Sequence, residues 1–171
     1  MNYPENLKPG DLIGICAPSA GIEKPEKQLK LDYAIKQLKE MGFNVVETES
    51  VRKDVQGRSA SKEIRAKEFL DLYLNPDVHA IIFAAGGDFL VEILPYLNLE
   101  NIEQNPKWFM GYSDPTTLLY LITTKLDIAT LYGVNAGSYD QTILHESLKN
   151  NIEWMKKEYG GEYPINDDNV E

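Results

Sequence analysis

One serine lies where a nucleophile could be placed, in the segment Gly-Tyr-Ser-Asp-Pro-Thr at residues 111–116. The apolar residues 108–112 predict a strand before Ser113, and the residues after it predict a helix whose first turn suits Pro115. Such a turn exposes a serine hydroxyl, and the helix N-terminus favours the negative charge that develops when the hydroxyl attacks a carbonyl. The G-x-S-x-G pattern is not matched, so a second interpretation stays open, in which Ser113 or Asp114 only caps the helix.

Backbone N–H groups near Ser113 are candidate donors to the oxyanion of an acyl-transfer reaction. The adjacent candidate is Asp114, because Pro115 has no N–H. Gly86 and Gly87 follow the most strand-like run of the chain, residues 80–85, and glycine lets N–H groups face a pocket without a Cβ atom in the way. A plain tight turn is the alternative for this pair, and both phosphate-loop patterns, G-x-x-x-x-G-K-[ST] and G-x-G-x-x-G, are absent.

The sequence offers no evident general base for Ser113, although a serine hydroxyl is a weak nucleophile until a base takes its proton. The chain has two histidines. His79 precedes the third predicted strand, at the end opposite the expected site. His145 adjoins Glu146 at the start of the last predicted helix, but neighbours on a helix diverge by about 100°, so the glutamate cannot easily orient the imidazole. We therefore leave both histidines out of the candidate site.

No group of histidine, cysteine or acidic residues has the spacing of metal ligands, so we expect neither a metal nor a cofactor. The single cysteine, Cys16, lies in an apolar run and is interpreted as a small buried hydrophobe.

The elements that must position these residues alternate between strand and helix. Strands are predicted at residues 11–17, 44–47, 80–85, 108–112 and 130–134. Apolar spacing of three and four residues predicts helices around residues 31–38, 61–75, 88–97, 114–126 and 144–155, the last ending at Gly160. This order predicts an α/β fold in which a parallel, flavodoxin-like sheet lies between two layers of helices. The carboxyl ends of the strands would then gather the glycine pair and Ser113 at one edge.

Composition excludes several classes of protein. With 171 residues, 43% hydrophobic and 26% charged, the chain fits one globular domain, predicted at residues 1–159, with an acidic tail or linker at 160–171. One cysteine excludes a disulfide scaffold, and a net charge of −10 argues against nucleic acid or an anionic membrane as partner. There is no run of 18 apolar residues and no signal-peptide pattern, so we expect a cytoplasmic protein without a membrane partner.

Several segments occur together in an order that resembles the LD-carboxypeptidase family, which includes muramoyltetrapeptide carboxypeptidases and microcin C self-immunity proteins. These segments are Leu-Lys-Pro-Gly-Asp at 7–11, Ala-Pro-Ser at 17–19, Arg65, Asn-Pro-Asp-Val-His-Ala-Ile-Ile at 75–82, Gly-Gly-Asp at 86–88, Leu-Pro-Tyr-Leu at 94–97, Asn-Pro-Lys-Trp-Phe-Met-Gly-Tyr-Ser-Asp at 105–114 and Tyr-Gly at 132–133. The resemblance covers about residues 5–158. It departs from the family at Val134, where Gly-Pro is usual, and at Pro115.

The resemblance implies a serine carboxypeptidase that hydrolyses an L,D-peptide bond, or a related amide bond, of cell-wall peptides. It assigns the nucleophile to Ser113 and the oxyanion hole to the N–H of Asp114 and one N–H of Gly86 or Gly87. In the family a Glu and a His of a C-terminal domain complete the triad, in a protein about twice this length. We therefore expect this chain to be the N-terminal half only, inactive alone, and to pair with itself or with the missing half.

Two other functions remain open from the sequence. The chain could be a truncated, non-catalytic homologue that binds a peptide or associates with itself. It could also be an α/β domain that binds a small anion at the glycine pair or at the helix after Ser113.

Overall fold

A five-stranded parallel β-sheet forms the centre of the computed structural model, which describes residues 1–140 and 145–157. The strands are β1 (Leu12–Cys16), β2 (Asn44–Glu47), β3 (Val78–Phe83), β4 (Trp108–Gly111) and β5 (Leu131–Tyr132), in the spatial order β2-β1-β3-β4-β5. This is the flavodoxin-like order, so the expected fold class is confirmed. The order reverses between β1 and β3, which is where open α/β sheets place their ligands.

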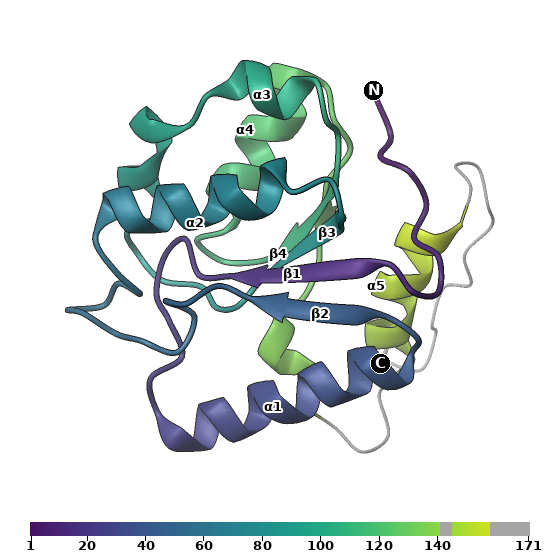
Figure 1. Cartoon of the computed structure of the whole chain (residues 1–171), viewed down its shortest axis with the longest axis horizontal. Coiled ribbons are helices and arrows are strands. Elements are labelled where there is room, and N and C mark those ends of the chain that lie inside the picture. Colours follow the sequence, from purple (N-terminus) through teal and green to yellow (C-terminus); the bar gives the residue numbers. More distant parts are fainter. Residues whose placement is uncertain (141–144, 158–171) are drawn as a thin grey trace, which may run out of the picture.

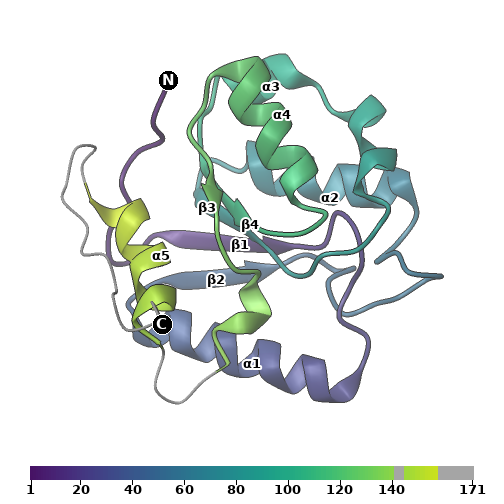
Figure 2. The same ribbon diagram turned by 180° about the vertical axis from the view of Figure 1, so that it is seen from behind.

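Helices cover both faces of the sheet (Figures 1 and 2). One layer contains α1 (Pro25–Glu40), the short 3-10 helix η2 (Ala136–Ser138) and α5 (Glu146–Lys156). The other contains α2 (Lys62–Leu74), the 3-10 helix η1 (Leu90–Tyr96), α3 (Leu99–Glu103) and α4 (Thr116–Leu126). Because alternate strand residues point to opposite faces, a strand between two helical layers must be apolar at every position, as residues 80–83 of β3 are.

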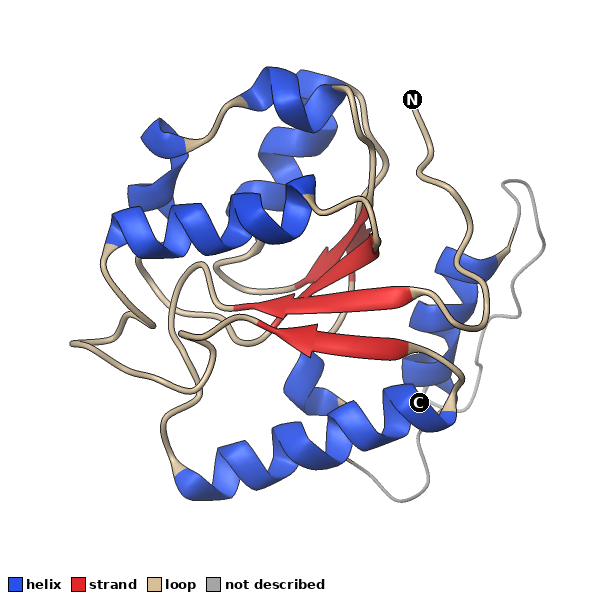
Figure 3. Ribbon diagram, viewed as in Figure 1, coloured by secondary structure: helices blue, strands red, loops and turns tan. Residues whose placement is uncertain are grey.

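The carboxyl ends of the strands lie together at one edge of the sheet, and the loops that follow β1, β3 and β4 meet there (Figure 3). The N-terminal segment lies at the opposite end, where the N–H of Leu7 donates to the carbonyl of Met155 in α5. No helix in the described ranges is long and apolar enough to cross a membrane.

The structure corrects some of the expected elements. His79 is the second residue of β3 rather than a residue before it. Helix α4 begins at Thr116 instead of residue 114, and the short helices α3 and η2 were not expected. Gly160, the expected end of the last helix, and the expected tail at 160–171 lie outside the described residues.

The loop at residues 50–61 is polar in composition but only partly exposed. Ser50, Val51 and Ser59 are fully buried, because the ends of the loop return to the sheet edge. The hydroxyl of Ser59 donates to the carbonyl of Ala17 at 2.6 Å. Paired buried hydroxyls therefore let a polar segment pack against the carboxyl end of β1.

Candidate active site

Ser113 adopts a backbone conformation that L-residues rarely occupy, with φ at 67°. It lies in the turn between β4 and α4, and its carbonyl accepts the N–H of Thr116 at the start of the helix. A residue held in the left-handed region costs folding free energy and persists only where its surroundings impose it. The strained turn between strand and helix is the geometry of a nucleophile elbow.

Neither Ser113 nor Asp114 caps helix α4 through its side chain. The N-cap position is occupied by Pro115, which makes no side-chain hydrogen bond. The interpretation of Ser113 or Asp114 as a helix cap is therefore wrong, and the contacts of their side chains are with other loops.

The two glycines of the turn after β3 face different neighbours. A Cβ atom added to Gly86 would lie 2.8 Å from Ser113 Oγ and 3.9 Å from the backbone nitrogen of Asp114. A Cβ atom on Gly87, whose φ is 148°, would collide with Ser19 Oγ and lie 2.8 Å from the nitrogen of Ala20. The turn thus lies between Ser113 on one side and the Ser19 loop on the other, and each contact excludes a side chain.

The glycine turn and Asp114 carry three backbone N–H groups that could act as donors. Within the residues that the structure describes, no hydrogen-bond acceptor is found for the N–H groups of Gly86, Gly87 or Asp114. Unpaired N–H groups are uncommon in folded proteins, and a group of them beside a serine hydroxyl suits an oxyanion.

The carboxylate of Asp114 turns away from α4 and joins the loops after β1 and β3. Its Oδ2 atom accepts the N–H of Leu90 at 2.8 Å and the hydroxyl of Ser19. The Ser19 Oγ atom in turn accepts the N–H of Phe89 at 3.3 Å. Ser19 is fully buried, so this contact is shielded from water.

On the other side of the turn, the buried side chain of Asn135 holds the residue before Ser113. Its Oδ1 accepts the N–H of Tyr112 at 3.2 Å, and its Nδ2 donates to the Tyr112 carbonyl at 3.4 Å. This side-chain amide continues the hydrogen bonding of the sheet beyond the end of β4.

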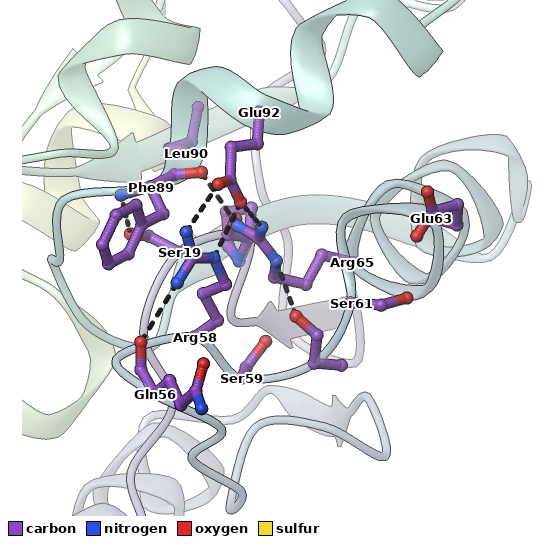
Figure 4. A network of polar contacts seen from close by, with 12 residues as sticks. Ser19, Gln56, Arg58, Ser59, Ser61, Glu63, Arg65, Phe89, Leu90 and Glu92 are labelled. Atoms are coloured by element: carbon purple, nitrogen blue, oxygen red, sulfur yellow. Dashed lines mark hydrogen bonds and ion pairs between the residues drawn. The ribbon is translucent and has the colours of Figure 1, made fainter.

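Behind the glycine turn, a fully buried arginine ties the surrounding loops together (Figure 4). Arg65 of α2 donates to the carbonyls of Pro18 at 2.7 Å, Phe89 at 3.0 Å and Ala60 at 3.0 Å. Its remaining guanidinium nitrogen pairs with Glu92 of η1 at 2.5 Å.

Arg58 completes this network from the loop before α2. It makes two hydrogen bonds to the Glu92 carboxylate, at 2.6 and 2.9 Å, and its guanidinium lies 3.5 Å from the centre of the Phe89 ring. Cation–π contact adds to the ion pair at this distance. Phe89, two residues after the glycine pair, is therefore held at its carbonyl by Arg65 and at its ring by Arg58.

The Glu92 carboxylate is expected to contribute stability that depends on pH. Hydrogen bonds from Arg58, and then from Arg65, lower the pKa of Glu92 to about 2. A depressed pKa in the folded state gives a contribution that is present above the unfolded pKa of about 4.3 and is lost as the pH falls towards 2. We expect Glu92→Gln to shift the urea midpoint most at pH 7 and progressively less from pH 4.5 to pH 2.5. An equal shift at every pH would contradict this assignment.

The two histidines are not brought to Ser113 by any described contact. His79 lies at the N-terminal end of β3, opposite the site, with its Nε2 3.6 Å from Asp11 Oδ1. His145 occupies the N-cap of α5, where its Nδ1 accepts the N–H of Ser147 at 3.3 Å. In the described ranges no group of three or more histidine, cysteine or acidic residues could hold a metal ion. The described part of the chain therefore presents a serine and N–H donors without a base.

Residues 13–133 match the family model of the LD-carboxypeptidase N-terminal domain, peptidase S66. The chain belongs to the LD-carboxypeptidase family. The glycine turn, Ser113 and the network behind them all lie within the matched residues of this LD-carboxypeptidase N-terminal domain.

Similar proteins are considerably longer than this domain. The microcin C7 self-immunity protein MccF of Escherichia coli is 36% identical over 127 residues, which are 74% of this chain and 37% of MccF. A Bacillus subtilis protein named "Probable murein peptide carboxypeptidase" is 28% identical over 134 residues, 78% of this chain and 41% of that protein. The chain therefore spans less than half the length of these relatives.

Solved structures agree with the fold of the LD-carboxypeptidase domain. MccF in its wild-type apo state superimposes with a TM-score of 0.82 at 30% identity, over 92% of this chain and 48% of MccF. MccF in complex with aspartyl sulfamoyl adenosine gives a TM-score of 0.81 with the same identity and coverage.

Sequence reasoning missed the residues behind the site. Ser19 and Arg65 entered only as parts of the family resemblance, and Glu92 was not singled out. One signal for Arg65 was available, because it lies four and seven residues before the buried Phe69 and Leu72, on the apolar stripe of its helix. An arginine at such a position predicts a buried ion pair, since a buried charge needs partners.

Proposed function

We propose that this domain supplies the nucleophile of a serine carboxypeptidase that cleaves an L,D-peptide bond, or a related amide bond, of cell-wall peptides. The observation that carries the proposal is Ser113 at φ 67° beside the unpaired N–H groups of Asp114 and the Gly86–Gly87 turn. The family membership and the MccF-like fold support the same chemistry. The reaction takes place, in this proposal, in the cytoplasm during recycling of cell-wall peptides.

In the proposed reaction, Ser113 Oγ attacks the carbonyl carbon of the scissile bond and forms a C–O bond. The hydroxyl proton passes to a general base and then to the departing amine, which leaves as the terminal D-amino acid. The N–H of Asp114 and one N–H of the glycine turn hold the oxyanion of the tetrahedral intermediate. Water then hydrolyses the acyl-enzyme and regenerates the Ser113 hydroxyl.

The base and the acid that orients it come, in this proposal, from a C-terminal half such as the one that the longer relatives have. The described residues place no base on Ser113, and loss of triad members costs on the order of 10⁴–10⁶ in rate. We also propose that the domain associates through its site face, with such a half or as a homodimer, because the site is incomplete without it.

The function is tested by comparing the chain alone with a joined enzyme, in which residues 1–157 replace the N-terminal half of the B. subtilis relative. We expect no measurable release of D-alanine from a murein tetrapeptide by the pure 171-residue chain, and release by the joined enzyme. Release by the chain alone that is lost in Ser113→Ala would contradict the need for a second half. A folded joined enzyme that is inactive on every amide offered would contradict the proposed function and favour a non-catalytic binding module.

A second substrate class is favoured by solved structures of MccF in complex with aspartyl sulfamoyl adenosine and with glutamyl sulfamoyl guanosine. We therefore include an aminoacyl sulfamoyl nucleoside in the same assay, with a second joined enzyme built on the C-terminal half of MccF. Hydrolysis of this compound but not of the tetrapeptide would assign the domain to self-immunity-like amide hydrolysis. Tight anion binding that survives Ser113→Ala, without an acyl-enzyme, would instead support the small-anion interpretation.

A further inference from the structure

The Ser19 hydroxyl and the Asp114 carboxylate connect three loops that are far apart in the sequence. Ser19 follows β1, Asp114 follows β4, and the N–H groups of Phe89 and Leu90 follow the glycine turn after β3. The hydrogen bonds run from Phe89 N–H to Ser19 Oγ, from the Ser19 hydroxyl to Asp114 Oδ2, and from Leu90 N–H to the same Oδ2 atom. One carboxylate oxygen thus links the nucleophile turn to the two loops beside it.

Ser19 also supports the glycine turn from behind. The nearest atom to a Cβ placed on Gly87 is Ser19 Oγ, and the carbonyl of Gly86 accepts the N–H of Ala20 at 3.2 Å. The turn is therefore held between the Ser19 loop and Ser113, whose Oγ lies 2.8 Å from the corresponding position on Gly86. A shift of the Ser19 loop would move the turn relative to the serine.

The direction of the Asp114 peptide N–H follows from where its side chain is fixed. An aspartate at the start of a helix ordinarily caps it with its carboxylate, but here the carboxylate is drawn across to Leu90 N–H and Ser19. The side chain and the N–H of one residue share a Cα atom, so anchoring the carboxylate restricts the backbone at Ser113 and Asp114. This gives a physical reason for the strained φ of Ser113 to persist.

We propose that Ser19 and the carboxylate of Asp114 are positioning residues, which hold the N–H of Asp114 and the Gly86–Gly87 turn in one arrangement around Ser113. The inference rests on the proposed function for its catalytic meaning. Ser19 is fully buried and does not meet the substrate; it acts through the groups that surround the oxyanion. A displacement of about 1 Å at such groups is enough to cost about 10²-fold in rate.

The experiment compares Ser19→Ala with Ser59→Ala in the 171-residue chain. Both serines are fully buried and lose one hydroxyl, but the Ser59 hydroxyl donates to the Ala17 carbonyl and has no hydrogen bond to Asp114 or the glycine turn among the described residues. The backbone N–H of Ser59 donates to the Ser19 carbonyl at 2.9 Å, and Ser59→Ala leaves this bond in place. Backbone NMR measures the amide exchange of Phe89 and Leu90, the amide shifts of Gly86, Gly87 and Asp114, and the coupling constant that reports φ of Ser113. Urea unfolding measures the stability of both variants, so that a general loss of stability is recognised.

We expect Ser19→Ala to speed amide exchange at Phe89 and Leu90 by about tenfold or more and to change the Ser113 coupling, while Ser59→Ala leaves both as in the parent chain. Unchanged signals around Ser113 in a folded Ser19→Ala chain, or equal changes in both variants, would overturn the proposal. If Ser19→Ala does not fold, Asp114→Ala and Asp114→Asn are compared in its place. The amide oxygen of Asn still accepts the Leu90 N–H, so the proposal requires that Asn preserve the signals that Ala disturbs.

In the joined enzyme the same variants separate positioning from catalysis. We expect Ser19→Ala to lower kcat by about 10–10²-fold with KM little changed, and Ser59→Ala to leave both close to the parent values. An inactive parent enzyme would count against the proposed function, whereas the NMR comparison would still decide the positioning role. Equal kcat in both variants would overturn the inference with the proposed function intact.

Discussion

Replacing Ser113 by alanine in the joined enzyme is expected to lower kcat for tetrapeptide hydrolysis by about 10⁴–10⁶-fold. The reason is that alanine removes the hydroxyl that forms the acyl-enzyme in the proposed mechanism, while the N–H groups beside it stay in place. Those groups and substrate binding leave a residual acceleration of about 10³–10⁴ over water. The measurement is the rate of D-alanine release, together with the mass of any acyl-enzyme trapped at short times.

The matched control for this prediction is Ser147→Ala, which removes an exposed hydroxyl on α5. It is expected to retain the parent rate within a few-fold and to form the same acyl-enzyme. The proposed role of Ser113 would fail if Ser113→Ala kept more than about one hundredth of the parent kcat, or if the acyl group were found on another residue. Circular dichroism and the urea midpoint of each variant show whether a loss of rate follows from unfolding.

Replacing Arg65 by methionine is expected to lower the free energy of unfolding by about 3–5 kcal/mol. Methionine fills much of the same space, but it removes the donor from the buried carbonyl of Pro18 and from the part-buried carbonyl of Ala60, and it takes one partner from Glu92. The part-buried carbonyl of Phe89 also loses Arg65 but keeps the N–H of Glu92 as a donor, at 3.2 Å. Each buried group left unpaired costs about 1–3 kcal/mol. For a domain whose total stability is about 5–15 kcal/mol, this is a large fraction, and urea unfolding of the 171-residue chain measures it.

Arg52 provides the control, because it is also an arginine paired with acidic side chains but is partly exposed at the surface. It pairs with Asp32 at 2.6 Å and with Glu47 at 2.8 Å, and its side chain is 28% exposed. We expect Arg52→Met to cost about 1 kcal/mol or less, as surface ion pairs do. If both variants lost the same free energy of unfolding, the hydrogen bonds from Arg65 to the carbonyls would not explain its contribution to stability.

The sequence alone determined the order of the main elements, because each depends on a local pattern. The uninterrupted apolar residues of β3 predicted a strand covered on both faces, and Ser61 with Asn75 marked the two ends of α2. Short elements were missed, since the five residues of α3 and the three of η2 carry too little periodicity to be recognised. The expected start of α4 was two residues too early. Aspartate is a common N-cap residue, but the side chain of Asp114 makes no capping hydrogen bond to α4.

For the candidate site, the sequence singled out Ser113 and the glycine pair, and it predicted that parallel strands would bring them to one edge. Only the tertiary structure decided that Gly86 faces Ser113 while Gly87 packs on Ser19. It also decided that the Asp114 carboxylate reaches the loops after β1 and β3, and that Arg65 is a buried donor to three carbonyls. The physical reason is that strand, helix and turn patterns are local in the chain. Hydrogen bonds between residues 19 and 114, or 18 and 65, depend on how separate loops pack at the sheet edge.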